Sequence, residues 1–530
     1  MGRDPEATHG SQRPGSYLPL RIAEGVRAAG SARPGKIALS QEGRVVSYRT
    51  LVERTDRVSN LAVDGLGLRP GDHVALMAPN CLEFLEIVSG LAAVGVAPAM
   101  VNPRLTGAEL ALIADDSEAR VLFVHHSLEE LARSSTFATV ERIVVIGDEY
   151  ERLLEQARPT PPLVRVEEWD PFCISYTSGT TGRPKGVLLS HRSRCLTFLA
   201  MAAEYGCYSS DDRTLAVAPL YHGGGFAFAM ASVYLGGTCE ILARFEPEKV
   251  LRILEELRIT SVFMVPTHFH AIFALGERAI AKADSSSLRS IISNAAPLPQ
   301  ATKQQIVASF GEKVLHESYG STEASIVCNL RPRDQLRKEQ CVGLPFPSTL
   351  VRLLDDDANE VGPGEVGELH SLSPYLFNGY WNRPEDTESV FRDGWVSVGD
   401  LARRDDEGYI YIVDRKNDMI ISGGVNIYPR EIEEALHAHA AVAEAAVVGV
   451  PHEYWGEAVA AYVVLREGTL VSDEELLQHC AERLARFKLP KSIEFVPSLP
   501  RTAAGKVLRR ELREQAQEVS SSSGDPGAPR

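Results

Sequence analysis

The chain has 530 residues, of which 44% are hydrophobic and 24% charged, and its formal net charge at pH 7 is -16. This length predicts about three to four domain-sized units, and the composition is that of a soluble globular protein. Because a strongly acidic chain repels polyanions, the charge excludes a general nucleic-acid or anionic-membrane binder and confines any phosphate site to a local basic pocket.

The eight cysteines are scattered without a C-x-x-C pair, and several lie inside apolar runs. This pattern indicates reduced, buried thiols in a cytoplasmic protein rather than a disulfide framework or a zinc site. Residues 1–16 are polar and rich in Gly and Pro, so we expect them to be disordered, and they contain no apolar core of signal-peptide length. The most apolar stretch, 223–242, is interrupted by Gly, Ser, Thr and Glu240, which favours a buried helix with flanking turns over a membrane span.

From residue 22 to about residue 166, apolar strands alternate with amphipathic helices, which is the pattern of a doubly wound α/β layer. A second α/β set is expected from about residue 172 to residue 327. The strands predicted for the first set are 73–77, 99–101, 120–124 and 142–146, with a helix over 82–94; those of the second set are 215–218, 238–242, 261–265 and 291–293.

Short alternating strands separated by Gly-, Pro- and Asp-rich turns follow, and they predict a small β-barrel-like unit over 342–413, with strands at 350–354, 367–372 and 409–413. The α/β alternation then restarts, so we place a domain boundary near Asn417. The predicted domains are an N-terminal domain, 17–416, with its α/β subdomains over 17–341; a small C-terminal α/β domain, 417–515; and a disordered Ser/Gly/Pro-rich tail, 516–530. Within the C-terminal domain we expect helices over 429–438 and 472–484 and strands over 442–450, 458–465 and 492–495.

Residues 176–186 read Tyr-Thr-Ser-Gly-Thr-Thr-Gly-Arg-Pro-Lys-Gly between the apolar runs 172–175 and 187–189, which predicts a loop joining two strands. Its glycines allow the backbone to approach a ligand closely, its hydroxyls donate hydrogen bonds, and Lys185 adds a mobile cation, so the loop suits a polyphosphate. It is not the common P-loop, which requires Gly-Lys-Ser/Thr, because Lys185 stands three residues after Gly182 and is followed by Gly and Val.

The whole string resembles the phosphate-loop signature of the adenylate-forming superfamily, which contains acyl- and aryl-CoA synthetases, adenylation domains and luciferases. Further motifs of that family follow in the expected order along nearly the whole chain. The resemblance implies ATP, Mg²⁺ and coenzyme A as cofactors. It assigns ATP binding to Thr177, Ser178, Gly179, Thr180, Thr181, Gly182 and Lys185.

Residues 219–226 read Pro-Leu-Tyr-His-Gly-Gly-Gly-Phe after an apolar strand. The resemblance makes His222 a catalytic residue that gates the acyl pocket, whereas a lone His is otherwise a satisfied structural residue. Relatives that activate amino acids carry an Asp beside a Phe here, so Tyr221 and His222 argue against an α-amino acid substrate. Glycines that leave room and apolar side chains predict a pocket for a bulky hydrophobic acid. The alternative is that the glycines are required only by the backbone conformation. The residues expected to line the pocket are Gly223, Gly224, Gly225, Phe226, Phe228, Met264 and Phe269.

Three further strings resemble the nucleotide-binding motifs of the family. Residues 293–298 resemble the adenine-side loop, with Asn294, Ala295, Ala296 and Pro297, although an ordinary strand-to-turn exit fits Pro297 equally well. In 318–324 the resemblance implies that Tyr319 stacks on adenine and that Gly320 and Ser321 contact the nucleotide. It makes Thr322 a catalytic residue that reaches the α-phosphate. Glu323, with Thr181, is assigned to Mg²⁺, which prefers hard oxygen ligands. Asp400 and Arg415 are assigned to the ribose.

The C-terminal motifs imply a second chemistry. Ser422, Gly423 and Gly424 resemble the segment lining the pantetheine tunnel, although a β-bulge also explains the glycines. Trp455, Phe487 and Lys491 occupy positions that contact CoA in aryl-CoA ligases, while one basic residue of that patch is replaced by Leu489. Lys506, in Pro-Arg-Thr-Ala-Ala-Gly-Lys, matches the catalytic lysine, and Asn417 replaces the usual Asp or Lys of the hinge.

We therefore predict an ATP-dependent acyl-CoA synthetase that activates an aliphatic, aryl or polycyclic acid as acyl-AMP and transfers it to CoA. The expected partner is a small carboxylic acid or, in an alternative interpretation, also an acyl-carrier protein or a partner adenylating enzyme. We expect no binding to nucleic acid or membrane. The protein is expected to be a monomer or a homodimer. An enzyme of one half-reaction, a non-catalytic nucleotide-binding regulator and a luciferase-like oxygenase remain as alternatives.

Overall fold

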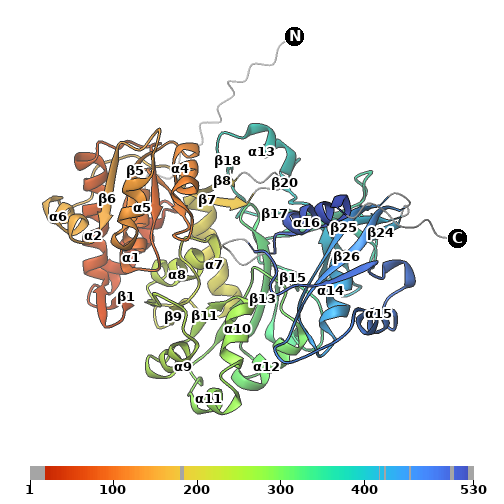
Figure 1. Cartoon of the computed structure of the whole chain (residues 1–530). Coiled ribbons are helices and arrows are strands. Elements are labelled where there is room, and N and C mark those ends of the chain that lie inside the picture. Colours follow the sequence, from red (N-terminus) through yellow and green to blue (C-terminus); the bar gives the residue numbers. More distant parts are fainter. Residues whose placement is uncertain are drawn as a thin grey trace, which may run out of the picture.

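The computed structural model describes residues 18–178, 184–416, 418–422, 425–452, 455–501 and 507–522. Figure 1 shows a large body built from the N-terminal part of the chain, coloured red to green, with the blue C-terminal part beside it. Sheets covered by helices form both parts. The predicted α/β class, with a large N-terminal domain and a small C-terminal one, is confirmed. The residues predicted to be disordered at the N-terminus, 1–16, lie outside the described ranges.

The first sheet of the large body has the strand order β18-β8-β7-β4-β3-β5-β6. Its centre is parallel, and every residue of β3 and β4 is buried, as expected for parallel strands covered by helices on both faces. The two strands around the phosphate loop, β7 and β8, are antiparallel to each other. The strands are β3 (His73–Met77), β4 (Ala97–Val101), β5 (Ala119–His125), β6 (Arg142–Ile146), β7 (Pro171–Ser178), β8 (Pro184–Ser190) and β18 (Gly379–Tyr380).

The second sheet has the order β15-β14-β13-β12-β11-β9-β10-β1-β2. It is parallel from β13 to β1 and antiparallel at both ends. The strands are β1 (Ile37–Gln41), β2 (Arg44–Ser47), β9 (Arg213–Ala216), β10 (Thr238–Ile241), β11 (Ser261–Met264), β12 (Ser290–Ser293), β13 (Leu315–Ser321), β14 (Ser325–Leu330) and β15 (Leu344–Pro345).

The order of the strands departs from the prediction of two α/β sets that follow each other along the chain. The early hairpin β1–β2 joins the second sheet, whereas β7 and β8 complete the first. Each sheet therefore contains strands from both predicted sets. The physical reason is that apolar periodicity identifies a strand but carries no information about which neighbour it pairs with.

Helices cover these sheets, and local signals in the sequence fix several of their starts. Ser47, Thr106 and Ser190 cap helix N-termini through their hydroxyls. The apolar stretch after residue 222 forms the buried helix α8, as predicted. The helices are α1 (Ile22–Ala32), α2 (Tyr48–Asn60), α3 (Leu82–Ala92), α4 (Gly107–Asp116), α5 (Glu129–Ser134), α6 (Asp148–Gln156), α7 (His191–Tyr205), α8 (Gly223–Tyr234), α9 (Pro247–Glu256), α10 (Pro266–Phe273), α11 (Glu277–Lys282) and α12 (Gln300–Phe310), with short turns η1 (Leu61–Gly65) and η2 (His126–Leu128).

The unit predicted to be barrel-like is an antiparallel sheet in which β17 pairs with β16 on one side and with β20 and β21 on the other. Within the described residues no pairing joins β16 to β22, so the sheet is open, and it lies next to η3 (Pro332–Asp334). Its elements are β16 (Leu350–Leu354), β17 (Val366–Leu372), α13 (Pro384–Val390), β19 (Phe391–Arg392), β20 (Trp395–Val396), β21 (Asp400–Arg404) and β22 (Ile410–Arg415).

The C-terminal part has its own five-stranded sheet and its own core, centred on Ile432, Val447 and Val463. The predicted disordered tail, 516–530, is wrong over its first residues, because the last helix continues to Ser522; Glu511, Glu514 and Ala516 are good helix formers. The elements are β23 (Ile420–Ser422), β24 (Val425–Ile427), α14 (Pro429–His437), β25 (Val442–His452), β26 (Gly456–Leu465), α15 (Asp473–Ala481), η4 (Arg486–Lys488), β27 (Ser492–Phe495) and α16 (Arg509–Ser522).

Candidate active site

The hairpin between β13 and β14 carries the residues predicted to hold the adenylate. Tyr319, Gly320 and Ser321 end β13, and Thr322 and Glu323 form the turn. A side chain at Gly320 would place its Cβ 1.9 Å from the carbonyl oxygen of Ser325, so only glycine fits this crossing. The Ser321 hydroxyl accepts a hydrogen bond from the amide of Ala324 at 3.0 Å. The turn is thereby fixed without any ligand.

The two residues predicted to bind ribose lie opposite each other on β21 and β22, where Asp400 is the register partner of Arg415. Arg415 Nε is 3.3 Å from the Asp400 carboxylate, which is buried and also accepts a hydrogen bond from the Tyr319 hydroxyl. Burial and the nearby Asp400 charge raise the pKa of Tyr319, so its hydroxyl stays a donor. The structure thus brings the predicted adenine residue and both predicted ribose residues together.

The loop predicted to border adenine follows β12. Ala295 has a left-handed φ of 76°, and the Asn294 side chain accepts a hydrogen bond from its amide. Residues 295–297 are exposed. The end of the loop is anchored to the strand that carries Tyr319, because the Leu298 amide donates to Glu317 at 3.2 Å and Glu317 forms a buried ion pair with Lys303. A short exposed segment held in an uncommon conformation agrees with a ligand-facing role.

The strands β7 and β8 hold the described ends of the phosphate loop. Thr177 is the register partner of Lys185, and Ser178 that of Pro184. Tyr176 donates from its hydroxyl to Asp116 at 2.7 Å, and the other oxygen of that carboxylate accepts from Arg383 at 2.6 Å. The Asp116 carboxylate therefore links β7, at the start of the loop, to the segment that follows β18. Four predicted ATP-binding residues lie outside the described residues: Gly179, Thr180, Thr181 and Gly182.

Sequence reasoning did not find the residues that contact Lys185 and Glu323. Tyr380, on β18, donates from its hydroxyl to Glu323 at 2.8 Å, and its ring centroid is 5.2 Å from Lys185 Nζ. Asp386, on α13, forms an ion pair with Lys185 at 2.8 Å. The only signal in the sequence was the Gly-Tyr-Trp string at 379–381, a short aromatic strand between turns. Because β18 pairs with β8, this distant segment lies at the phosphate loop (Figure 1).

The predicted acyl pocket surrounds the start of α8. His222 precedes the helix and lies against Tyr221, with ring centroids 4.5 Å apart. At Gly225 a Cβ would lie 2.0 Å from the carbonyl oxygen of Pro219, so this glycine serves the backbone; at Gly224 it would lie 3.3 Å from the Phe263 ring. Gly223 has room for a Cβ.

The apolar side chains predicted to line the pocket are all buried. Phe228 stacks on Phe263 with the ring centroids 4.3 Å apart, and Phe226 stacks on Phe172. Met264 and Phe269 are fully buried in the core beside β9 and β12. Phe226 and Phe228 thus belong to the aromatic packing of α8, whereas Met264 and Phe269 belong to a separate core, and the contact of all four with a substrate stays a prediction.

Three of the predicted CoA-binding residues lie near one another on the C-terminal part. Ser422 is the register partner of Gly456, next to Trp455, and Lys491 Nζ is 5.7 Å from the centroid of the Trp455 ring. Phe487, on η4, is 49% exposed, so it offers an apolar surface to a ligand. Gly423, Gly424, the predicted hinge residue Asn417 and the predicted catalytic residue Lys506 lie outside the described residues.

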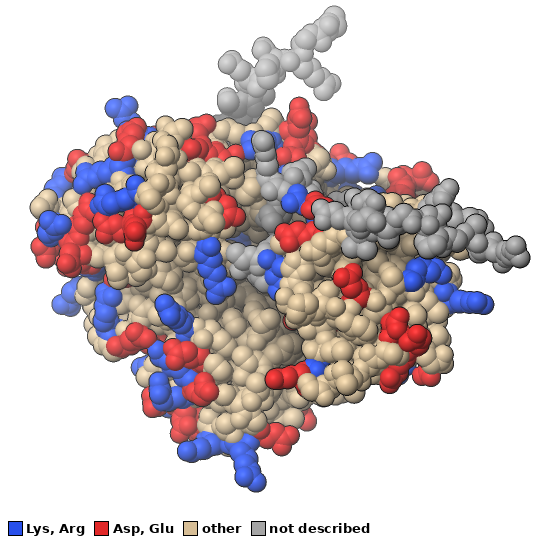
Figure 2. Space-filling view, in the orientation of Figure 1, with Lys and Arg blue, Asp and Glu red and all other residues tan. Residues whose placement is uncertain are grey.

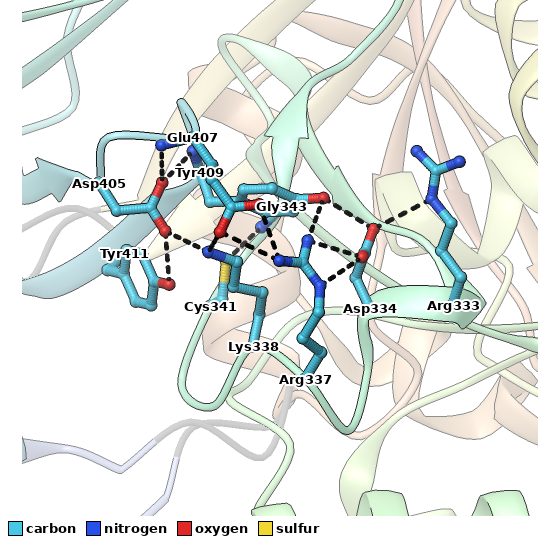
Figure 3. A network of polar contacts seen from close by, with 10 residues as sticks. All are labelled: Arg333, Asp334, Arg337, Lys338, Cys341, Gly343, Asp405, Glu407, Tyr409 and Tyr411. Carbon is cyan, nitrogen blue, oxygen red and sulfur yellow. Dashed lines mark hydrogen bonds and ion pairs between the residues drawn. The ribbon is translucent and has the colours of Figure 1, made fainter.

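A network of ion pairs, drawn in Figure 3, fixes the strands that carry Asp400 and Arg415 against the second sheet. Lys338 donates to Asp405 at 2.6 Å, and Arg337 donates to Glu407 at 2.8 Å. Tyr409 donates from its hydroxyl to Asp334 at 2.9 Å. The network joins the segment after β14 to the turn between β21 and β22, so it fixes Asp400 relative to the hairpin that carries Tyr319.

Comparisons with known proteins agree with this geometry. Residues 26–381 match the family model described as AMP-binding enzyme, and residues 431–506 match the AMP-binding enzyme C-terminal domain. The chain belongs to the AMP-binding enzyme family. It is an AMP-forming acyl-CoA synthetase, a class of enzyme that uses ATP, Mg²⁺ and CoA.

Relatives of this synthetase span nearly its whole length. A feruloyl-CoA synthase of an Amycolatopsis species is 37% identical over 91% of this chain and 96% of its own, and a long-chain-fatty-acid–CoA ligase of Bacillus subtilis is 33% identical over 94% and 96%. The crystal structure of ATP-bound MatB from Rhodopseudomonas palustris has a TM-score of 0.88 at 30% identity, covering 95% of this chain and all of that one.

The surface and the helices add two observations on the synthetase. Acidic and basic side chains are interspersed over the face shown in Figure 2. None of the helices in the described ranges combines the length and the apolar character needed to cross a membrane.

Proposed function

We propose that this synthetase activates a bulky, hydrophobic carboxylic acid and transfers it to CoA, performing both half-reactions. The observation that carries the proposal is the meeting of Tyr319, Asp400 and Arg415 at the hairpin that also holds Thr322 and Glu323. It supports a nucleotide held by its adenosine end with its phosphates towards Glu323 and Lys185. The aromatic wall around α8 supports an apolar acid.

In the first half-reaction the acid's carboxylate oxygen attacks the α-phosphorus of ATP, a P–O bond forms to give acyl-AMP, and pyrophosphate leaves. Thr322 would donate to the α-phosphate, and Tyr319 with Asp400 would hold the adenosine. Glu323 would bind Mg²⁺, which offsets the charge of the triphosphate. We assign to Lys506 the stabilisation of the oxygens on which charge develops.

In the second half-reaction the sulfur of CoA attacks the acyl carbonyl, AMP leaves, and the thiol proton is released. Gly423 and Gly424 would leave room for the pantetheine arm, while Trp455, Phe487 and Lys491 would contact CoA. Lys506 and Gly423 both belong to the C-terminal domain and are needed at one site, so we infer that this domain rotates about Asn417 between the half-reactions.

A matched pair of variants tests the division of labour. Lys506→Ala should lower single-turnover acyl-AMP formation on the order of 10²- to 10³-fold, yet retain thioester formation from supplied acyl-AMP and CoA. Gly423→Trp should do the reverse, because its side chain blocks the thiol path. Equal losses in both reactions for Lys506→Ala would exclude domain rotation.

The acid is identified by a pyrophosphate-release screen over aliphatic, aryl and polycyclic acids. A best kcat/KM with acetate or malonate would exclude a bulky substrate. Because a fatty acid–[acyl-carrier-protein] ligase of Streptomyces coeruleorubidus is 34% identical over 91% of this chain, a carrier protein is the second candidate acceptor. Acyl transfer to a holo-carrier protein at a higher rate than to CoA would favour it.

A further inference from the structure

Lys185 is already paired with a carboxylate in the protein alone. Its ammonium lies 2.8 Å from Asp386 Oδ1, and the two side chains are 17% and 37% exposed. Asp386 lies in the first turn of α13, which follows β18 by a short turn. The pair therefore joins the strand that leaves the phosphate loop to a segment far along the chain.

The neighbourhood of this pair is rigid. Tyr380 on β18 is the register partner of Val187, two residues after Lys185, and the Trp381 amide donates to the carbonyl of Gly186 at 2.8 Å. Thr387 of α13 accepts from the Tyr380 amide at 2.9 Å, which fixes the helix on the strand. The lysine ammonium faces the Tyr380 ring, whose hydroxyl reaches Glu323. Asp386 is thus held within reach of Lys185 by the backbone on both sides.

We propose that Asp386 is the resident counter-ion of Lys185, which exchanges this carboxylate for the phosphate oxygens of MgATP and takes it back when pyrophosphate leaves. The inference rests on the proposed function, because it uses Lys185 as a phosphate ligand. It adds a residue that shapes the affinity for polyphosphate without binding it.

The difference in burial gives the exchange its direction. Lys185 is the more buried partner, and an ammonium left without an anion there loses solvation. Asp386 is more exposed, so water can solvate its carboxylate once the lysine has turned to a phosphate group. Binding of nucleotide therefore opposes the ion pair, and departure of pyrophosphate restores it.

The test is calorimetric titration of the full-length protein with MgATP and, separately, with magnesium pyrophosphate. Asp386→Asn keeps the shape of the side chain and removes its charge, so it should tighten both ligands about three- to tenfold. Glu385→Gln is the matched control, because it removes an equal charge from the adjacent, exposed position of the same helix; it should change either affinity less than twofold.

A Lys185→Met variant distinguishes competition of Asp386 with the ligand for Lys185 from direct repulsion between Asp386 and the ligand. In that background Asp386→Asn should have no effect beyond that of Glu385→Gln. Unchanged or weaker binding by Asp386→Asn, or the same gain with and without Lys185, would overturn the proposal. Should Lys185→Met fail to fold, slower pyrophosphate release by Asp386→Asn in stopped flow supports the exchange and an unchanged rate overturns it. Absence of MgATP binding by the parent protein would contradict the proposed function instead.

Discussion

The guanidinium of Arg194 on α7 is buried and donates to the hydroxyl of Ser325 at 3.2 Å. Within the described residues this is its only polar contact, and its Nε has no partner. Burial lowers the pKa of Arg194, and Cys173, whose thiolate would favour the charged guanidinium, is neutral because burial raises its thiol pKa to about 12. A buried cation without a carboxylate opposes folding. Ser325 follows the turn of Thr322 and Glu323, where the ATP phosphates of the proposed function would supply the missing negative charge.

Arg194→Met should therefore raise stability and lower activity together. We expect the free energy of unfolding to increase by about 1 to 4 kcal/mol, the range for replacing buried charges by apolar groups, and the acyl-AMP formation rate to fall. Urea unfolding and single-turnover adenylation measure the two effects. Thr197→Val is the control, since it removes a neighbouring hydroxyl and no charge. A decrease in stability for Arg194→Met would show that the arginine is a structural residue.

Tyr380→Phe should raise the Mg²⁺ concentration needed for half-maximal adenylation by up to about tenfold, because Glu323 loses a hydrogen bond to a charged group. The ring remains, so the contact with Lys185 persists. The measurement is acyl-AMP formation over a series of Mg²⁺ concentrations at fixed ATP. Tyr375→Phe, which deletes a hydroxyl bonded to the Pro347 carbonyl, is the control and should leave the Mg²⁺ dependence unchanged. An equal shift in both variants would count against a role at the metal.

Asp414 links the two domains and offers a third test. It lies on β22, and its carboxylate accepts from the amide of Arg430 in the first turn of α14 at 3.0 Å. Burial raises the pKa of Asp414, and its other carboxylate oxygen accepts from the amide of Arg415 at 2.7 Å, so an Asn side chain keeps one of the two acceptors. Asp414→Asn should lose less stability than Asp414→Ala, which removes both acceptors and should cost about 1 kcal/mol, as for loss of a helix cap. Chemical unfolding of the two variants checks this order, and the reverse order would refute it.

The burial of His191 leads us to expect that the protein loses stability in acid. Burial, with Arg21 nearby, lowers its pKa to about 3, well below the ordinary 6.5, so the folded protein cannot take up the proton that the unfolded chain binds. Its contribution to stability is complete above pH 6.5 and is lost as the pH falls towards 3, by about 1.4 kcal/mol per pH unit. Between pH 7.5 and 4.5, the urea midpoint of His191→Gln should fall less steeply with decreasing pH than that of the parent. Parallel curves would contradict this.

Local patterns in the sequence predicted most individual elements, because alternation, capping residues and turn residues act within a few positions. β6, β16 and β27 have the predicted bounds, and the predicted strands of the phosphate loop are present. Long-range pairing could not be predicted in this way. The first hairpin joins the second sheet, and β18 brings Tyr380 and Asp386 to Lys185, because these contacts depend on strand order and not on local periodicity.

The site residues show the same division. The motif strings placed Tyr319, Asp400 and Arg415, and the structure brings them together. Arg194 was overlooked because an arginine is normally exposed, whereas α7 is buried over most of its length and Arg194 is buried with it. The sequence alone could not distinguish Gly225, which the backbone requires, from Gly223, which has room for a side chain.

The position of β18 at the edge of the first sheet bears on how the chain folds during its synthesis. Its neighbour β8 leaves the ribosome first, and β18 follows roughly 190 residues later. At a synthesis rate of about 5 to 20 residues per second, the edge of β8 therefore stays unpaired for on the order of 10 to 40 s. During that time its backbone amides and carbonyls are open to other chains. Nascent chains that end before residue 379 should therefore aggregate or recruit chaperones, and those that extend past α13 should not.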